Sequence, residues 1–367
     1  MSAPKRLRAW CTARALFVWF GVLGALGALD VCVLHAFVPA YVIPRYDVPN
    51  LRLADRTAGN NLGILFAATA QRVQAKRQRV VALVGDSTVM AWGERDNVTL
   101  TQQLSRGVVK ANVPNVTVAE FASPGVPADE AAVLVTKALG LGASLVLYAV
   151  TPRVICDLAR NATDADEYAL DSDVAPELGA RFLLSRYDSR TLAASFIRSH
   201  WALLRFRTEI SHTLSQWLVG ALAIMPPLPS VGYTIRSIPP IPGGPYWYRT
   251  KCNIGLDNIR VQALIRIADA CAETGRCLIY SGPLNQRAIE RFEPGLVSDF
   301  SLLTRRIFQE RNVPYRNYAY AVGAPGFLHG PSGPDAIHLN VLGRQRLANL
   351  LAPEVARALM AQPQPKT

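Results

Sequence analysis

Hydrophobic and polar positions divide the chain into a long apolar segment near the N-terminus and a region of short alternating elements after it. The first 14 residues carry four basic side chains and no acid, and the apolar run 15–38 that follows is interrupted only by Asp30 and His35. A helix of that length spans about 36 Å, enough to cross a bilayer. The basic flank is expected to stay in the cytoplasm, which places everything after Pro39 on the other side of the membrane.

A cleaved signal peptide is the alternative for this segment, with 15–29 as its apolar core and a weak cleavage site around 25–27. The apolar character continues past that site, which favours an uncleaved anchor. The Ala-, Val- and Arg-rich composition favours a bacterial protein, so we expect a single-pass protein of the inner membrane with a periplasmic C-terminal domain. Asp30 and His35 are either functional groups inside the membrane or, as we favour, residues near its outer interface.

Short apolar runs beyond residue 79 predict the strands of a parallel sheet. They lie at 80–84, 116–121, 144–150 and 276–280, with a weaker fifth at 314–318. Helical patterns lie between and after them, at 99–111, 128–140, 255–274, 296–311 and 341–360. This alternation predicts right-handed crossovers and a three-layer α/β/α sandwich, in which ligands bind beyond the carboxyl ends of the strands.

The expected organisation is an anchor, a tether and one large α/β domain with a helical insertion. The boundaries are 1–38 for the basic tail and transmembrane anchor, 39–79 for a Pro-containing tether and a leading helix near 61–77, 80–360 for the domain, and 157–250 for the insertion. The insertion holds an acidic loop, an amphipathic helical stretch at about 189–223 and a Pro-rich run. Its helix suits packing on the body of the domain, or docking on the membrane surface or an integral partner.

Charge and motifs exclude several classes of function. The formal net charge of +12 suits attraction to anionic lipid head groups or an acidic glycan, or else a plain solvated surface. No nucleic-acid motif is present, so no nucleic-acid partner is expected. The chain has no G-x-G-x-x-G after a strand, no P-loop and no Cys/His spacing typical of zinc, so no cofactor and no metal site are expected.

Six cysteines are present, and Cys11 and Cys32 belong to the membrane segment. The other four could form two disulfides in an oxidising compartment. Cys271 and Cys277 flank a short loop that brings them within disulfide reach, so we expect this pair to form.

A serine stands at the end of the first predicted strand. The motif Gly85-Asp86-Ser87 directly follows the apolar run 80–84 and precedes a helical segment. A strand-to-helix junction exposes the serine hydroxyl at the sheet edge and aims helix N-terminal amides at the same point, where an oxyanion can sit. Ser87 is therefore the candidate nucleophile, with a helix N-cap as the alternative role.

A second motif near the C-terminus supplies a base, because Asp335 stands three residues before His338. At this spacing the carboxylate can accept from one ring nitrogen and leave the other to face Ser87, which fixes the tautomer and stabilises the imidazolium. The Gly- and Pro-rich flank 330–334 predicts a loop entering the last helix. The alternative is a surface loop with an N-capping Asp. His329 is the rival base, but no Asp precedes it by three residues.

These two motifs resemble the SGNH (GDSL) hydrolase superfamily, whose members carry Gly-Asp-Ser near the start of the catalytic domain and Asp-x-x-His near its end. The resemblance covers residues 80–360 apart from the insertion. It implies a flavodoxin-like α/β/α fold, with Ser87 as nucleophile, His338 as base and Asp335 as the orienting carboxylate. Asp86 would be mainly structural.

The resemblance also implies oxyanion donors, and here the chain departs from the family pattern. Gly125, after the second predicted strand, stands where the family has its second-block Gly. The third-block Asn is missing from the loop after the third strand, where Gly-x-Asn-Asp would be typical. Thr151, Arg153 and Asn285 are the candidates to replace it, and the sequence does not choose between them. The loss of one such donor costs roughly 3–4 kcal/mol of transition-state stabilisation.

Within this superfamily, the chain is similar to membrane-anchored proteins of cell-surface acylation, of the teichoic acid D-alanyl transfer and alginate O-acetylation types. The features that carry this resemblance are the missing Asn, the single anchor and the segment 280–285. This implies a serine O-acyltransferase or esterase that takes an acyl group, such as acetyl, onto Ser87 and passes it to a glycan or glycolipid hydroxyl or to water. It also implies a multi-span membrane-bound O-acyltransferase as partner. The hypothesis from another class is a non-catalytic scaffold or binding protein on the same fold, within an envelope acylation complex.

Overall fold

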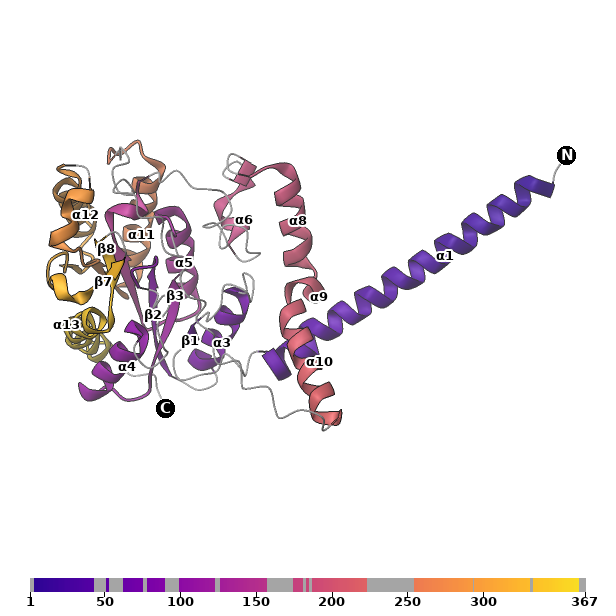
Figure 1. The fold of residues 1–367 in the computed structure, drawn as a ribbon, viewed down its shortest axis with the longest axis horizontal. Helices are drawn as coiled ribbons and strands as arrows, with labels where there is room; N and C mark the ends of the chain where they lie inside the picture. The colour runs from indigo at the N-terminus through magenta and orange to yellow at the C-terminus, as the bar shows by residue number, and fades with distance from the viewer. Residues whose placement is uncertain are drawn as a thin grey trace.

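The computed structural model contains an N-terminal helix, a parallel α/β domain and a helical insertion (Figure 1). The residues it describes are 3–42, 51–52, 62–74, 78–89, 99–122, 126–156, 174–180, 183–184, 187–222, 254–292, 294–330 and 333–362. The five predicted strands and the predicted helices at 61–77, 99–111, 128–140, 255–274, 296–311 and 341–360 have counterparts within these ranges.

The centre of the domain is a six-stranded sheet in which neighbouring strands are parallel. In spatial order the strands are β1 (Leu51–Arg52), β3 (Val116–Ala122), β2 (Arg79–Gly85), β4 (Leu145–Val150), β5 (Cys277–Ser281) and β6 (Tyr315–Asn317). Without the edge strand β1, this is the 2-1-3-4-5 order of flavodoxin-like folds, so the predicted fold class is confirmed. β1 lies in the expected tether, and its two residues are too few to show a strand pattern.

The apolar runs form central strands because helices cover both faces of the sheet. In β2 the residues from Val80 to Val84 are fully buried, as expected where neither face meets water. Alternate residues enter two separate cores. One lies beneath α3 (Leu62–Gln74), α5 (Ala128–Gly140), α11 (Ile259–Thr274) and α12 (Leu296–Gln309), and the other beneath α4 (Leu100–Lys110) and α13 (Val341–Met360).

A small antiparallel hairpin replaces the loop that was expected before the last helix. Its strands are β7 (Phe327–Gly330) and β8 (Gly333–Leu339), with Phe327 opposite Leu339. The Gly- and Pro-rich sequence indicated a loop because Gly and Pro are disfavoured in strands. Here Gly333 and Pro334 lie at the turn end of the hairpin and pair with Gly330 and His329, with Gly333 at a positive φ of 101°. The register then shifts before Leu339 pairs with Phe327.

The N-terminal helix consists of α1 (Ala3–Cys32) and the π-helix η1 (Val33–Val42), and it projects from the rest of the molecule (Figure 1). The stretch Val18–Tyr41 is long and apolar enough to cross a membrane. The helix continues past Pro39, where the tether was expected to begin, because the apolar pattern runs on through Val42.

The insertion contributes the short helix α6 (Ala175–Leu178) and three consecutive helices, α8 (Ser189–His200), α9 (Ala202–Arg205) and α10 (Arg207–Leu222). The predicted stretch 189–223 is thus helical, but it is interrupted at Trp201, whose backbone is extended, and at Phe206. The acidic loop and the Pro-rich run fall at 157–173 and 223–253, outside the described residues.

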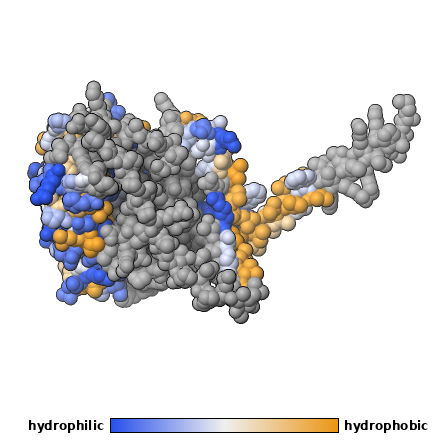
Figure 2. All heavy atoms as spheres, in the orientation of Figure 1, coloured by the Kyte–Doolittle hydropathy of each residue, from blue (hydrophilic) through white to orange (hydrophobic). Residues whose placement is uncertain are grey.

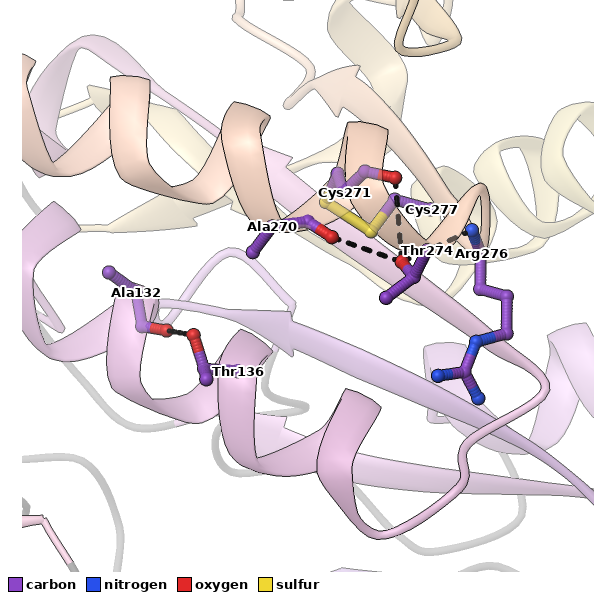
Figure 3. Close-up of a disulfide and its surroundings, with 7 residues drawn as sticks. All are labelled: Ala132, Thr136, Ala270, Cys271, Thr274, Arg276 and Cys277. Atoms are coloured by element: carbon purple, nitrogen blue, oxygen red, sulfur yellow. Dashed lines mark hydrogen bonds between the residues drawn. A yellow bond between two sulfur atoms is a disulfide. The ribbon is translucent and has the colours of Figure 1, made fainter.

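The expected disulfide between Cys271 and Cys277 is present, with 5.4 Å between the two Cα atoms (Figure 3). It joins the end of α11 to the start of β5, and Gly275 ends the helix between them in the left-handed conformation, at φ 64°. Cys156 is also disulfide-bonded. Cys32, in the anchor, is a free thiol.

Candidate active site

Ser87 lies at the carboxyl edge of the sheet, two residues after the end of strand β2. The strand ends at Gly85, and the turn that follows is closed by a 3.1 Å hydrogen bond from the Val89 N–H to the Asp86 carbonyl. A Cβ at Gly85 would lie 2.5 Å from Val89 Cγ2, so this turn needs glycine at its start. Ser87 is 3% exposed. The expected helical continuation falls on residues 90–98, outside the described part of the chain.

Asp86 ties this turn to the neighbouring strand. One carboxylate oxygen accepts the Thr88 N–H at 2.9 Å, and the other accepts the hydroxyl of Thr151, just after β4, at 3.2 Å. Asp86 is buried, so these bonds replace the water that the carboxylate has lost. The contacts of Asp86 are structural, since they fix the turn that carries Ser87.

The β7–β8 hairpin brings His338 to Ser87, although the two residues are 251 positions apart. His338 Nε2 lies 2.9 Å from Ser87 Oγ, and His338 Nδ1 lies 2.9 Å from Asp335 Oδ2. The side chains of His338 and Asp335 are 11% and 17% exposed, so the site is largely enclosed but not sealed. The rival base His329 lies on β7 with an exposed side chain, opposite Pro334.

Asp335 is oriented by its own strand. Its Oδ1 accepts the backbone N–H groups of Ile337 and His338, each at 2.8 Å, which leaves Oδ2 for the ring. Burial raises the pKa of Asp335, but the hydrogen bond and charge of His338, together with the two backbone bonds, outweigh burial and hold this pKa below its usual range. The side chain is therefore a carboxylate at neutral pH. It accepts the Nδ1 proton and leaves Nε2 as an acceptor for the serine hydroxyl.

Asn285 positions the strand that carries Asp335. Its Nδ2 donates to the Asp335 carbonyl at 2.8 Å, and its backbone N–H donates to the Ala336 carbonyl at 2.9 Å. Its Oδ1 accepts the Arg287 N–H at 3.1 Å. The side chain is fully buried and turned towards β8. These contacts suit a positioning role, whereas Asn285 was expected among the oxyanion donors.

Asn340 holds the other end of β8, a role that the sequence analysis missed. Its Nδ2 donates to the carbonyls of Pro325 and Phe327 at 2.8 and 3.0 Å, and its Oδ1 accepts the Gly343 N–H at 3.0 Å as the N-cap of α13. An asparagine directly before a long helical pattern was the available signal. His338 thus lies on a strand that is fixed at both ends.

The remaining oxyanion candidates differ in whether their hydrogen-bond donors are already bonded within the protein. The Thr151 hydroxyl is committed to Asp86. Arg153 lies on the 3-10 turn η4 (Pro152–Val154), directly beyond β4, and its Nε is buried without a hydrogen-bond partner in the described structure. Gly125 falls on 123–125, outside the described residues. Among the three third-block candidates, Arg153 therefore keeps an uncommitted donor.

Two fully buried tyrosines also lie close to Asp86, and the sequence analysis did not single them out. Tyr148 and Tyr280 stand on β4 and β5 and enter opposite cores of the sheet. Burial raises the pKa of both hydroxyls, and the negative charge of Asp86 raises it further. Both hydroxyls therefore remain neutral at physiological pH.

Comparisons with known proteins add little. No protein-family model matches the chain, and no curated protein matches it in sequence. A lipase/acylhydrolase from Enterococcus faecalis is similar in structure with a TM-score of 0.41 and 10% identity, over 79% of this chain and 100% of that one. LAE5, an alpha/beta hydrolase enzyme from the metagenome of Lake Arreo, Spain, has a TM-score of 0.38 and 12% identity, over 77% and 97%. At these values, neither likeness bears on the activity of this chain.

Proposed function

We propose that the chain is a membrane-anchored serine enzyme of SGNH type that transfers an acyl group to a cell-surface glycan or glycolipid, or hydrolyses such an ester. The observation that supports it is the convergence of Ser87 Oγ, His338 and Asp335 through two contacts of 2.9 Å. Three chemically matched groups from two distant parts of the chain meet in the order nucleophile, base and orienter.

The proposed reaction has two steps, acylation of Ser87 and deacylation. His338 Nε2 takes the hydroxyl proton as Ser87 Oγ attacks the ester carbonyl, and it returns that proton to the leaving oxygen when the tetrahedral intermediate collapses. An acceptor hydroxyl or water then loses its proton to Nε2 and attacks the acyl-serine, and Ser87 regains a proton. Asp335 stays ionised and stabilises the imidazolium in both steps.

Arg153 is the donor that takes the place of the family's third-block Asn. It lies just beyond β4, where that Asn would stand, and its Nε has no partner in the described structure. A guanidinium near the carbonyl would stabilise the negative oxygen that forms during attack. The Thr151 hydroxyl donates to Asp86, and the Asn285 amide donates one N–H to the Asp335 carbonyl and is turned towards β8.

The location we propose is the inner membrane, with the α/β domain on its periplasmic side. The apolar stretch Val18–Tyr41 supports a single span. The disulfide between Cys271 and Cys277 supports an oxidising compartment for the domain. A multi-span O-acyltransferase would supply the acyl group, as the family resemblance implies.

A non-catalytic scaffold is the second candidate function, and the missing third-block Asn favours it. The full chain, purified in detergent, separates the two when it is treated with a fluorophosphonate probe and with an activated acetyl ester. We expect labelling and turnover in the wild type and neither in Ser87→Ala. Ser298→Ala removes an exposed serine hydroxyl on α12 and should behave as the wild type. A wild-type chain that is folded but neither labelled nor active would establish the scaffold.

A further inference from the structure

The outer end of the anchor is joined to the helices of the insertion. The Leu203 N–H, on α9, donates to Asp30 Oδ1 at 2.7 Å. Tyr41 packs edge-on against Trp217 of α10, with 5.3 Å between ring centroids. A small core also joins the two parts, formed by Val33, Val38, Ala202 and Phe206. The helices α8–α10 are therefore held against residues 30–41, the C-terminal half of the apolar stretch Val18–Tyr41.

These helices expose an unusual amount of apolar surface. Their apolar face consists of Phe196, Ile197, Trp201, Leu204, Leu214, Trp217 and Leu218, all exposed. Within α10, the spacings of Leu214, Trp217 and Leu218 place these three side chains on one side of the helix. Figure 2 shows the apolar colour running without a break from these helices onto α1. A patch of this kind marks an interaction surface.

The arrangement of the helices indicates what covers this face. α8, α9 and α10 run across the end of α1, with most of α1 extending away on one side and the sheet lying on the other (Figure 1). When α1 crosses a bilayer, α8–α10 therefore lie along its surface. The segment 189–222 carries four arginines and a single glutamate, which suits anionic lipid head groups. Two exposed tryptophans are also typical of the membrane interface.

We propose that α8–α10 form an interfacial platform, whose apolar face enters the head-group region of the bilayer that α1 spans. The occupant is an anionic phospholipid bilayer. The inference rests on the anchor of the proposed function. It adds that the α/β domain is held by two membrane contacts, one spanning and one lying on the surface, so that the domain has a fixed height and tilt and acts on acceptors close to the membrane.

The test places an environment-sensitive NBD label on the full chain in nanodiscs of phosphatidylcholine and phosphatidylglycerol. The starting protein carries Cys11→Ser and Cys32→Ser, and the label is attached without reductant. Two further variants each add one cysteine for the label: Phe196→Cys on the platform and Leu302→Cys on α12. Phe196 and Leu302 are 63% and 66% exposed, so they are a matched pair. Val22→Cys, in α1, reports on the span itself. The parent without the new cysteine gives the background.

We expect a blue-shifted spectrum and strong quenching by brominated lipids at positions 22 and 196, and neither at 302. If the label at 22 is quenched but the label at 196 behaves like the one at 302, the platform is wrong and the anchor is retained. An unquenched label at 22 overturns the anchor and the platform with it. Fluorophosphonate labelling of Ser87 in the same samples reports separately on the catalytic proposal and on folding.

Discussion

Replacing Asp335 with asparagine tests the site by changing one atom of one side chain. Oδ1 accepts two backbone N–H groups, so the asparagine carbonyl keeps that position and the amide nitrogen takes the place of Oδ2. The opposite amide orientation would set NH₂ against two donors and lose two hydrogen bonds, a penalty of roughly 2–4 kcal/mol. The fold therefore keeps its contacts, while the group facing the imidazole changes from acceptor to donor.

A donor facing Nδ1 reverses the tautomer of His338. The ring proton moves to Nε2, which can then donate to Ser87 Oγ but can no longer accept its proton. In Ser–His–Asp sites this change lowers kcat by about 10⁴-fold, which corresponds to about 5.4 kcal/mol of transition-state stabilisation. We expect a loss of about 10³- to 10⁴-fold in kcat in Asp335→Asn, in a chain that still folds.

The assay is turnover of an activated acetyl ester by the full chain, alongside thermal unfolding. Asp188→Asn is the matched control, since Asp188 accepts the Thr191 N–H at 2.8 Å as the N-cap of α8, outside the site. It should keep the wild-type kcat. If Asp335→Asn folds normally and stays within about tenfold of the wild type, Asp335 does not set the tautomer of His338 and the catalytic assignment is wrong.

Three further predictions follow from the same structure. Arg153→Ala should lower kcat by about 10²- to 10³-fold without changing the melting temperature, and an unchanged kcat would remove Arg153 from the oxyanion site. Because the pKa of Asp335 is lowered by folding, its stabilising charge is present above its unfolded pKa of about 3.9 and is lost as pH falls through the folded value. In urea unfolding, the wild type should therefore have a higher free energy of unfolding than Asp335→Asn at neutral pH, and this difference should disappear only in acid. A difference that stays the same at every pH would contradict this. Replacing Cys271 and Cys277 with serine should lower the free energy of unfolding by about 2 kcal/mol; Cys32→Ser is the control, and an unshifted urea midpoint would refute the estimate.

The sheet was predictable because its strands are buried on both faces. A central strand such as β2 must be apolar at every position, and this leaves an unbroken run in the sequence that helices then bracket. The hairpin β7–β8 leaves no such run. Burial along β8 does not alternate, since the neighbours Ala336 and Ile337 are both buried. Gly and Pro interrupt the strand, and its pairing depends on a partner strand that has no pattern of its own. The sequence therefore located Asp335 and His338 but not the element that carries them.

The supporting contacts were harder to predict than the reacting groups. Ser87 and His338 belong to motifs whose chemistry is visible in the residue types. Asn285 acts through backbone atoms of a segment 50 positions away, and nothing in the sequence around either segment reports that contact. Similarly, the commitment of the Thr151 hydroxyl to Asp86 depends on the adjacency of β2 and β4, which only the sheet order supplies.

The fate of the acyl group is decided outside these contacts. Asp86, Asn285 and Asn340 fix the serine turn and the histidine strand, and this geometry serves attack by water and by a glycan hydroxyl equally well. Transfer therefore requires that the acceptor reach acyl-Ser87 faster than water does, which depends on surfaces that seat the acceptor and exclude solvent. Of the described part of the insertion, helices α8–α10 supply no side chain to the two cores of the α/β domain. A change there should alter the ratio of transfer to hydrolysis and leave the rate of Ser87 acylation unchanged.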